Sequence, residues 1–63
     1  MQFMYFINGT QSTRFQASMF LSNYYGGDPE FLMVNLEMMA REYLVSTGDA
    51  LYIDNSGVSV AWA

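Results

Sequence analysis

The sequence of 63 residues predicts a single α+β domain, residues 1–63, in which two helices cover a small, mainly antiparallel sheet of three strands. Three observations support this fold class. Apolar residues alternate near the N-terminus as they do in a strand, and two middle stretches carry the start and stop signals of helices. The alternation then returns near the C-terminus, around a turn. The predicted element order is therefore β-α-α-β-β.

The first strand is predicted at residues 2–7, where apolar side chains point to both faces. We therefore expect it to be covered on both sides or to lie in the middle of the sheet, beside the C-terminal hairpin. Asn8-Gly9 follows, and it predicts a tight turn because both residues tolerate a positive φ. Residues 10–11 would then form a brief return.

The first helix is predicted to begin after an N-cap at Ser12 or Thr13 and to run to about Tyr25. The glycine pair at 26–27 ends it, and so short a connection makes the two helices neighbours in space. Tyr24 and Tyr25 would lie at the corner between the helices. There they are either core residues with hydroxyl partners or surface contact residues.

The second helix, residues 28–47, has the clearest local signals in the chain. Asp28 can cap its N-terminus, and Pro29 fits the first helical position. The helix dipole favours the negative charge of Glu30 in the first turn, and Gly48 can end the helix in the left-handed conformation. Its main apolar face, placed at about 100° per residue, is predicted to face the core. This face consists of Leu32, Leu36, Met39, Ala40 and Tyr43, bordered by Met33 and Leu44, with Glu37 and Arg41 nearly opposite.

A second apolar stripe follows the back of this helix. It consists of Phe31, Val34, Met38 and Val45, and we call it the outer stripe. A surface helix normally has one apolar stripe, and a helix that is apolar nearly all round is buried on more than one side. Two alternatives remain. Either the first helix or a terminal strand covers the outer stripe, or the stripe stays open for a partner or a second copy of the chain.

Two further strands are predicted at residues 50–54 and 57–62, joined by a turn. Leu51 shares one face with Ile53, and the second strand alternates in the same way up to Trp62. Trp62 either caps the core or lies at an interface. Together with residues 2–7, these two strands make up the predicted three-stranded sheet.

The missing residue types exclude most catalytic chemistry. The chain has no cysteine, histidine or lysine, and so it lacks the usual thiol nucleophile, imidazole base, Schiff-base amine and zinc ligands. We expect a protein that is not an enzyme and that holds no cofactor or metal. With a formal charge of −4, it should not bind a phosphate backbone directly. Mimicry of nucleic acid would be limited to a local cluster of Asp28, Glu30 and Glu37.

Apolar residues make up 52% of the sequence and aromatic residues 17%, which is more than the core of so small a domain should need. Aromatic residues, Met and Arg are enriched in protein interfaces, where Lys is depleted. The composition therefore favours a protein that binds another protein or itself. The sequence shows no membrane span, no basic amphipathic surface and no signal peptide, and we expect a cytoplasmic location.

A resemblance supports this interpretation. The stretch Phe6-Ile7-Asn8-Gly9, then Ser12-Thr13-Arg14-Phe15 at the start of a helix, and then a C-terminal hairpin, resembles small single-domain proteins of phages and prophages. That group includes anti-CRISPR and other host-inhibitory proteins. The resemblance covers the order of the elements and the residues near the first turn, without a diagnostic motif. It implies inhibition by occlusion in the host cytoplasm and does not identify a target.

The functional prediction is a small acidic protein that binds and inhibits a host protein, for example a defence or nucleic-acid-processing complex, by steric occlusion. The alternative is a structural homo-oligomer that assembles through the outer stripe. Apolar anchors would supply affinity, and acidic residues would steer the chain towards a basic site. The predicted partner-binding residues are Tyr24, Tyr25, Asp28, Glu30, Phe31, Val34, Met38, Glu42 and Val45.

Overall fold

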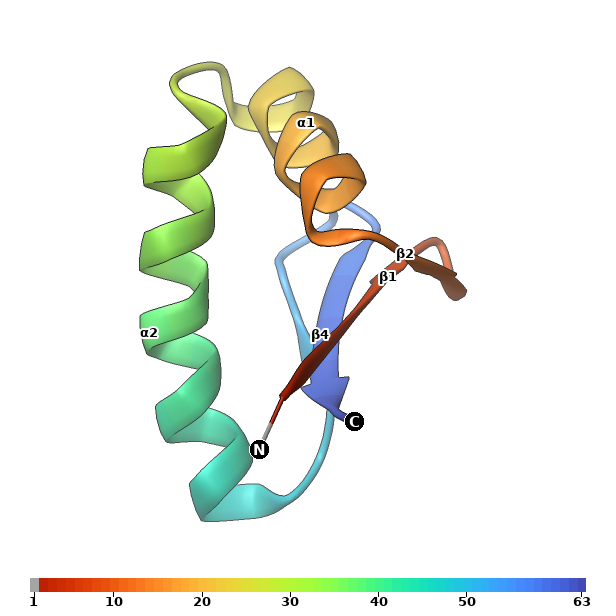
Figure 1. Ribbon diagram of the computed structural model, residues 1–63, viewed down its shortest axis with the longest axis vertical. Helices are drawn as coiled ribbons and strands as arrows, with labels where there is room; N and C mark the ends of the chain where they lie inside the picture. The colour runs from red at the N-terminus through yellow and green to blue at the C-terminus, as the bar shows by residue number, and fades with distance from the viewer. Residues whose placement is uncertain (1) are drawn as a thin grey trace.

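The computed structural model describes residues 2–63 as two layers, with a sheet on one side and two helices on the other (Figure 1). The predicted α+β fold, with two helices and an antiparallel sheet, is confirmed. The elements are β1 (Phe3–Ile7), β2 (Thr10–Ser12), α1 (Arg14–Tyr25), α2 (Pro29–Thr47), β3 (Leu51–Tyr52) and β4 (Val58–Trp62).

The sheet has four strands, so the prediction of three strands is wrong. The strand order is β2-β1-β4-β3, and every neighbouring pair is antiparallel. The additional strand is β2, which pairs with β1 over three residues. It forms because Asn8 and Gly9 both have positive φ, 50° and 84°, and a turn of this kind aligns the two strands that leave it.

Strand β1 lies between β2 and β4, which confirms its predicted place beside the C-terminal hairpin. Its register with β4 runs from Phe3 opposite Trp62 to Ile7 opposite Val58. The apolar residues on its helix-facing side reach the core, and the ring of Trp62 stacks on Phe3 at a centroid distance of 5.1 Å. Trp62 therefore closes one end of the core.

Both helices begin and end close to the predicted residues. Thr13 caps α1, and its hydroxyl accepts a hydrogen bond from the Gln16 amide at 3.0 Å. Asp28 caps α2 by accepting from the Phe31 amide at 2.8 Å. Gly48 ends α2 in the left-handed conformation, with φ 76°. Local capping chemistry thus sets the limits of both helices.

Strand β3 is shorter than the predicted strand at 50–54 and covers only Leu51–Tyr52. Asp54 has a φ of 46°, which is outside the range of extended strands. The Ser56 amide donates to the Ile53 carbonyl at 3.0 Å, and so the chain turns two residues earlier than the alternation suggests. The edge of the sheet at β3 is therefore very short.

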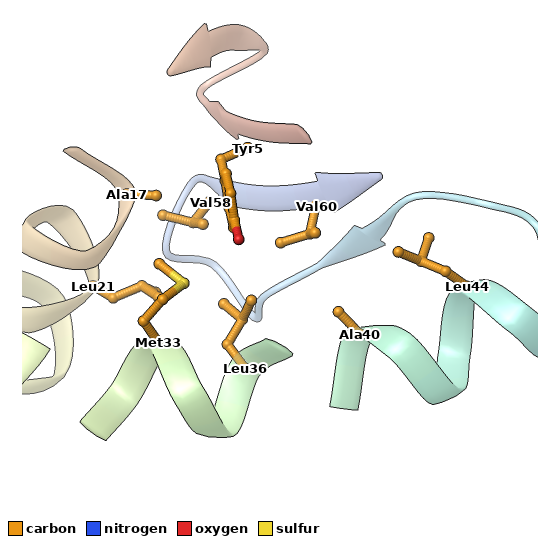
Figure 2. Packing of buried hydrophobic residues seen from close by; sticks show 9 residues of the cluster. All are labelled: Tyr5, Ala17, Leu21, Met33, Leu36, Ala40, Leu44, Val58 and Val60. Carbon is orange, nitrogen blue, oxygen red and sulfur yellow. The ribbon is translucent and has the colours of Figure 1, made fainter. Parts of the chain in front are cut away.

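The core lies between the sheet and the two helices (Figure 2). In Figure 2 the side chains of Tyr5 and Val60 point from the sheet towards α2. The buried hydrophobic residues are Tyr5, Ala17, Leu21, Met33, Leu36, Ala40, Leu44, Val58 and Val60. Tyr5 is the one aromatic residue among them, and most aromatic residues of the described chain are exposed.

Candidate protein-binding surface

The inner face of α2 consists of Met33, Leu36, Ala40 and Leu44, all of which are buried. This differs from the predicted face, because Met39 and Tyr43 are exposed and Met33 and Leu44 lie at its centre instead of its border. The helix is rotated by roughly 60° from the predicted orientation, at 100° per residue. An interaction on one side of the helix explains the rotation.

That interaction is a polar cluster, which we call the clamp, formed by Tyr5, Arg14, Glu30 and Glu37. The Arg14 guanidinium donates to Glu37 through Nε (2.9 Å) and Nη2 (3.1 Å). It also donates to both carboxylate oxygens of Glu30, at 3.0 Å each. The Tyr5 hydroxyl donates to Glu37 as well. The clamp therefore joins β1, the first residue of α1 and two turns of α2.

The prediction that Glu37 and Arg41 lie opposite the core is therefore wrong. Glu37 is partly buried and faces Tyr5. Arg41 is exposed, and its guanidinium lies 5.2 Å from the centroid of the Phe3 ring, a cation–π contact. Both side chains lie on the side of α2 that borders β1, because their partners are there.

The electrostatics of the clamp fit a structural role. Hydrogen bonds and the charge of Arg14 hold the pKa of the Glu37 carboxyl below its ordinary value. Burial, together with the hydrogen bond to Glu37, raises the pKa of Tyr5 to about 12. Glu37 is thus a weakened base and Tyr5 a weakened acid at neutral pH. Neither group is prepared for proton transfer.

The outer stripe lies on the opposite side of α2 from the inner face. The exposed fractions are 67% for Phe31, 44% for Val34, 66% for Met38 and 72% for Val45. The structure leaves the outer stripe uncovered, which is the second of the two alternatives. Neither α1 nor any strand within residues 2–63 covers it. The side chains recur at spacings of three, four and seven residues, which places them in one line along the helix.

The predicted acidic residues differ in their surroundings. Asp28 is occupied as the cap of α2, and Glu30 is paired with Arg14. Hydrogen bonding to Arg14 lowers the pKa of the Glu30 carboxyl. Within residues 2–63 no salt bridge involves Glu42, which is exposed on α2. Of the two residues expected to steer association, Glu42 is the one whose charge is not neutralised by a neighbour.

Tyr24 and Tyr25 are both exposed, and their rings meet edge to face at 4.8 Å. The Tyr25 hydroxyl donates to Asp54, and this bond raises the pKa of Tyr25 to about 12. Tyr25 and its partner Asp54 both line a cleft of about 380 Å³ between α2 and β3. The cleft is also lined by Met39, Tyr43, Leu51, Tyr52, Ile53 and Asp54.

The structure thus separates the predicted partner-binding residues into three groups. Phe31, Val34 and Met38 follow one another along α2, and Val45 lies beyond Arg41 on the same line. Tyr25 turns towards the cleft, and Glu30 turns towards α1. Sequence reasoning missed the clamp. One signal was present, because Arg14 opens a helix where the dipole disfavours a positive charge. Such a residue needs an acidic partner elsewhere.

The solvent-accessible surface is 4110 Å², close to the roughly 4,100 Å² expected of a monomer of this mass. The area is therefore ordinary, and twelve large hydrophobic residues among residues 2–63 are exposed on it. Among residues 2–63 no helix is long and apolar enough to cross a membrane, and no acidic cluster could hold a metal ion. Comparison with protein-family models, curated proteins and solved structures found no match.

Proposed function

We propose that the chain is a protein-binding module that inhibits a partner by covering part of its surface. The observation that carries the proposal is the outer stripe, four large apolar side chains left in solvent along one line of α2. Contiguous apolar surface of this kind is typical of interaction sites, whereas single exposed apolar residues are ordinary. The partner contributes an apolar groove or a helix face that accepts this line.

The spacing of the outer stripe supports a helical mode of recognition. Phe31, Val34, Met38 and Val45 occupy alternating three- and four-residue steps, with Arg41 in the remaining position. This is the spacing of the seam in two packed helices or of a helix in a groove. Phe31 and Met38 are the largest anchors, and truncating such residues commonly has the greatest effect on affinity.

The charges support a partner whose site has a basic rim. Glu42 borders the outer stripe, and the net charge of the chain is −4. We propose a host protein as the partner, for example a defence or nucleic-acid-processing complex in the host cytoplasm, in keeping with the resemblance to phage inhibitors. Charge would then accelerate association, while the apolar anchors would limit dissociation.

Self-association through the same stripe is the second candidate. Phe31 and Val45 lie seven residues to either side of Met38. In an antiparallel pair of α2 helices centred at Met38, Phe31 of one copy would lie against Val45 of the other. A two-fold interface of this type would bury the outer stripe without a foreign partner. The two candidates use the same side chains and differ in the occupant.

The experiment compares Met38→Asp with Asn35→Asp. Both variants add one negative charge to an exposed position of α2, but Asn35 lies outside the outer stripe. Host proteins retained by the immobilised chain are identified, purified and titrated against each variant. We expect Met38→Asp to weaken binding by about tenfold or more, and Asn35→Asp to change it little. Equal binding by both variants would remove the outer stripe from the proposal.

Mass measurement separates the second candidate from the first. If α2 pairs with itself, Met38→Asp converts an oligomer into a monomer and Asn35→Asp does not. Circular dichroism of both variants checks that they remain folded. A folded, monomeric wild-type chain that retains no partner, under conditions where its target is present, would contradict both candidates.

A further inference from the structure

Strand β2 forms one edge of the sheet and pairs only with β1 among residues 2–63. The hydrogen-bond pattern of β1 shows which groups of β2 face outward. The backbone amide of Asn8 donates to the Gly57 carbonyl at 2.7 Å, and that of Ala63 donates to the Gln2 carbonyl at 2.8 Å. The backbone groups of the even-numbered residues of β1 are therefore hydrogen-bonded to β4. The odd-numbered residues, Tyr5 and Ile7, therefore bond towards β2.

It follows that one residue of β2 presents its backbone to the outside. Tyr5 is opposite Ser12 and Ile7 is opposite Thr10, so these two residues of β2 use their backbone groups on β1. Gln11 lies between them, and its N–H and C=O point away from β1. No hydrogen bond to either group is formed within residues 2–63.

A groove of about 520 Å³ lies beside this edge, between β2 and α1. Its apolar lining comes largely from Phe15, Met19 and Phe20, all exposed, and Phe15 is exposed by 71%. No charged side chain of the described residues lines the groove. An open strand edge therefore lies next to an uncharged apolar surface, at the opposite end of the sheet from β3.

We propose that a second copy of this chain occupies the edge and the groove. In this dimer the two β2 strands pair antiparallel, with the two-fold axis beside Gln11. Each Gln11 donates its N–H to the carbonyl of the other, which is the pattern of a hydrogen-bonded antiparallel pair. Thr10 lies opposite Ser12 of the second copy, and the two sheets become one sheet of eight strands.

Self-complementarity favours a second copy over another occupant. A single outward-facing residue supplies one donor and one acceptor, and a two-fold axis through it satisfies both. The same rotation brings the α1 helices together, so that Phe15 and Met19 of each copy fill the groove of the other. Each chain has a net charge of −4, but no charged side chain lines the groove. Filling the groove with the second copy therefore brings no like charges together there.

The dimer goes beyond the proposed function and leaves the outer stripe accessible. Helix α2 packs over β4 and β3, away from the β2 edge. Two outer stripes would therefore be presented, one at each flank of the continuous sheet. A partner with two equivalent sites would be bound with increased avidity.

The test measures solution mass against concentration for the full chain and three variants. Gln11→Pro removes the outward N–H, and proline is tolerated on an edge strand where its nitrogen faces solvent. Phe15→Asp places a charge in the groove at an exposed position. Val45→Asp, on the outer stripe, is the matched control for Phe15→Asp. Circular dichroism confirms that each variant is folded.

We expect the wild type to reach twice the chain mass of 7.2 kDa as its concentration rises. Gln11→Pro and Phe15→Asp should each raise the dimer dissociation constant by about tenfold or more, and Val45→Asp should leave it unchanged. Hydrogen exchange of the Gln11 amide should slow as the dimer forms. If Gln11→Pro fails to fold, Phe15→Asp and the exchange measurement still test the interface.

Two results would overturn the proposal. One is a wild-type chain that stays at 7.2 kDa up to about 1 mM, because a specific interface should bind more tightly than that. The other is a dimer that Val45→Asp dissociates while Phe15→Asp leaves it intact. The second result would place self-association on the outer stripe.

Discussion

The two sides of α2 are similar in sequence and opposite in environment. The inner face has Met33, Leu36, Ala40 and Leu44, and the outer stripe has Phe31, Val34, Met38 and Val45. Each side carries four apolar residues, one of which is a methionine. Met33 is fully buried, whereas Met38 is exposed by 66%. The larger side chain at the N-terminal end, Phe31, belongs to the side that faces solvent.

This difference shows that burial on α2 is not decided by hydrophobicity alone. Ala40 is on the inner face because a small side chain allows the helix to approach the sheet closely. Glu37, a charged residue, is brought towards the sheet because Tyr5 and Arg14 satisfy its carboxylate. The clamp therefore selects which of two apolar sides becomes the core.

The largest expected effect comes from the two methionines. Met33→Ala removes a fully buried side chain and leaves a cavity, which should lower the free energy of unfolding by about 2–5 kcal/mol. Met38→Ala should change it by less than about 0.5 kcal/mol, since its side chain is already in solvent. Urea denaturation of both variants measures the contrast. Equal destabilisation would show that the outer stripe is part of the core.

A smaller effect is expected from two glutamates on the same helix. Glu37→Ala leaves the Tyr5 hydroxyl and part of the Arg14 guanidinium without their acceptor, at a cost of about 1–3 kcal/mol. Glu42→Ala removes an exposed carboxylate and should cost less than about 0.5 kcal/mol. Thermal and urea unfolding provide the values. If the Glu37 variant is as stable as the wild type, the clamp does not orient α2.

The smallest effect concerns pH. The folded pKa of Glu37 is lowered, so its contribution to stability is present at neutral pH and is lost as pH falls below about 4.5. The folded pKa of Tyr5 is raised to about 12, so its contribution is present below pH 10 and is lost as pH rises from 10 to 12. Unfolding free energies measured across both ranges report these losses.

Two variants serve as controls for the pH profile. Glu37→Gln should flatten the acid limb, and Tyr5→Phe should flatten part of the alkaline limb, whatever their effect on stability at neutral pH. An acid limb of the same slope in Glu37→Gln would mean that other carboxylates cause it.

Local chemistry made much of this fold predictable. The caps at Thr13 and Asp28 and the left-handed Gly48 act through neighbours in sequence, and the helix limits follow from them. The turn at Asn8-Gly9 was also recognised, but the length of the strand that follows it was not. Thr10, Gln11 and Ser12 are polar and carry no alternation, since β2 is an edge strand whose pairing comes from the turn.

The candidate site was predictable in composition and not in orientation. The outer stripe could be predicted from helical spacing, but the choice between a covered and an open stripe could not. That choice depends on the clamp, which joins Arg14 to Glu37 across 23 positions of sequence. Sequence periodicity carries no information about such a pair. The turn of Tyr25 towards Asp54 was hidden for the same reason.

The central position of β1 has a consequence for folding during synthesis. Its partner β4 follows every other helix and strand of residues 2–63, since Phe3 pairs with Trp62 and Ile7 with Val58. Contacts so distant in sequence form slowly, because a long segment must be ordered first. While the ribosome extends the chain through α2, both apolar sides of that helix are exposed to chaperones and to other nascent chains. The inner face of α2 is fully covered only when β4 has left the exit tunnel and joined the sheet.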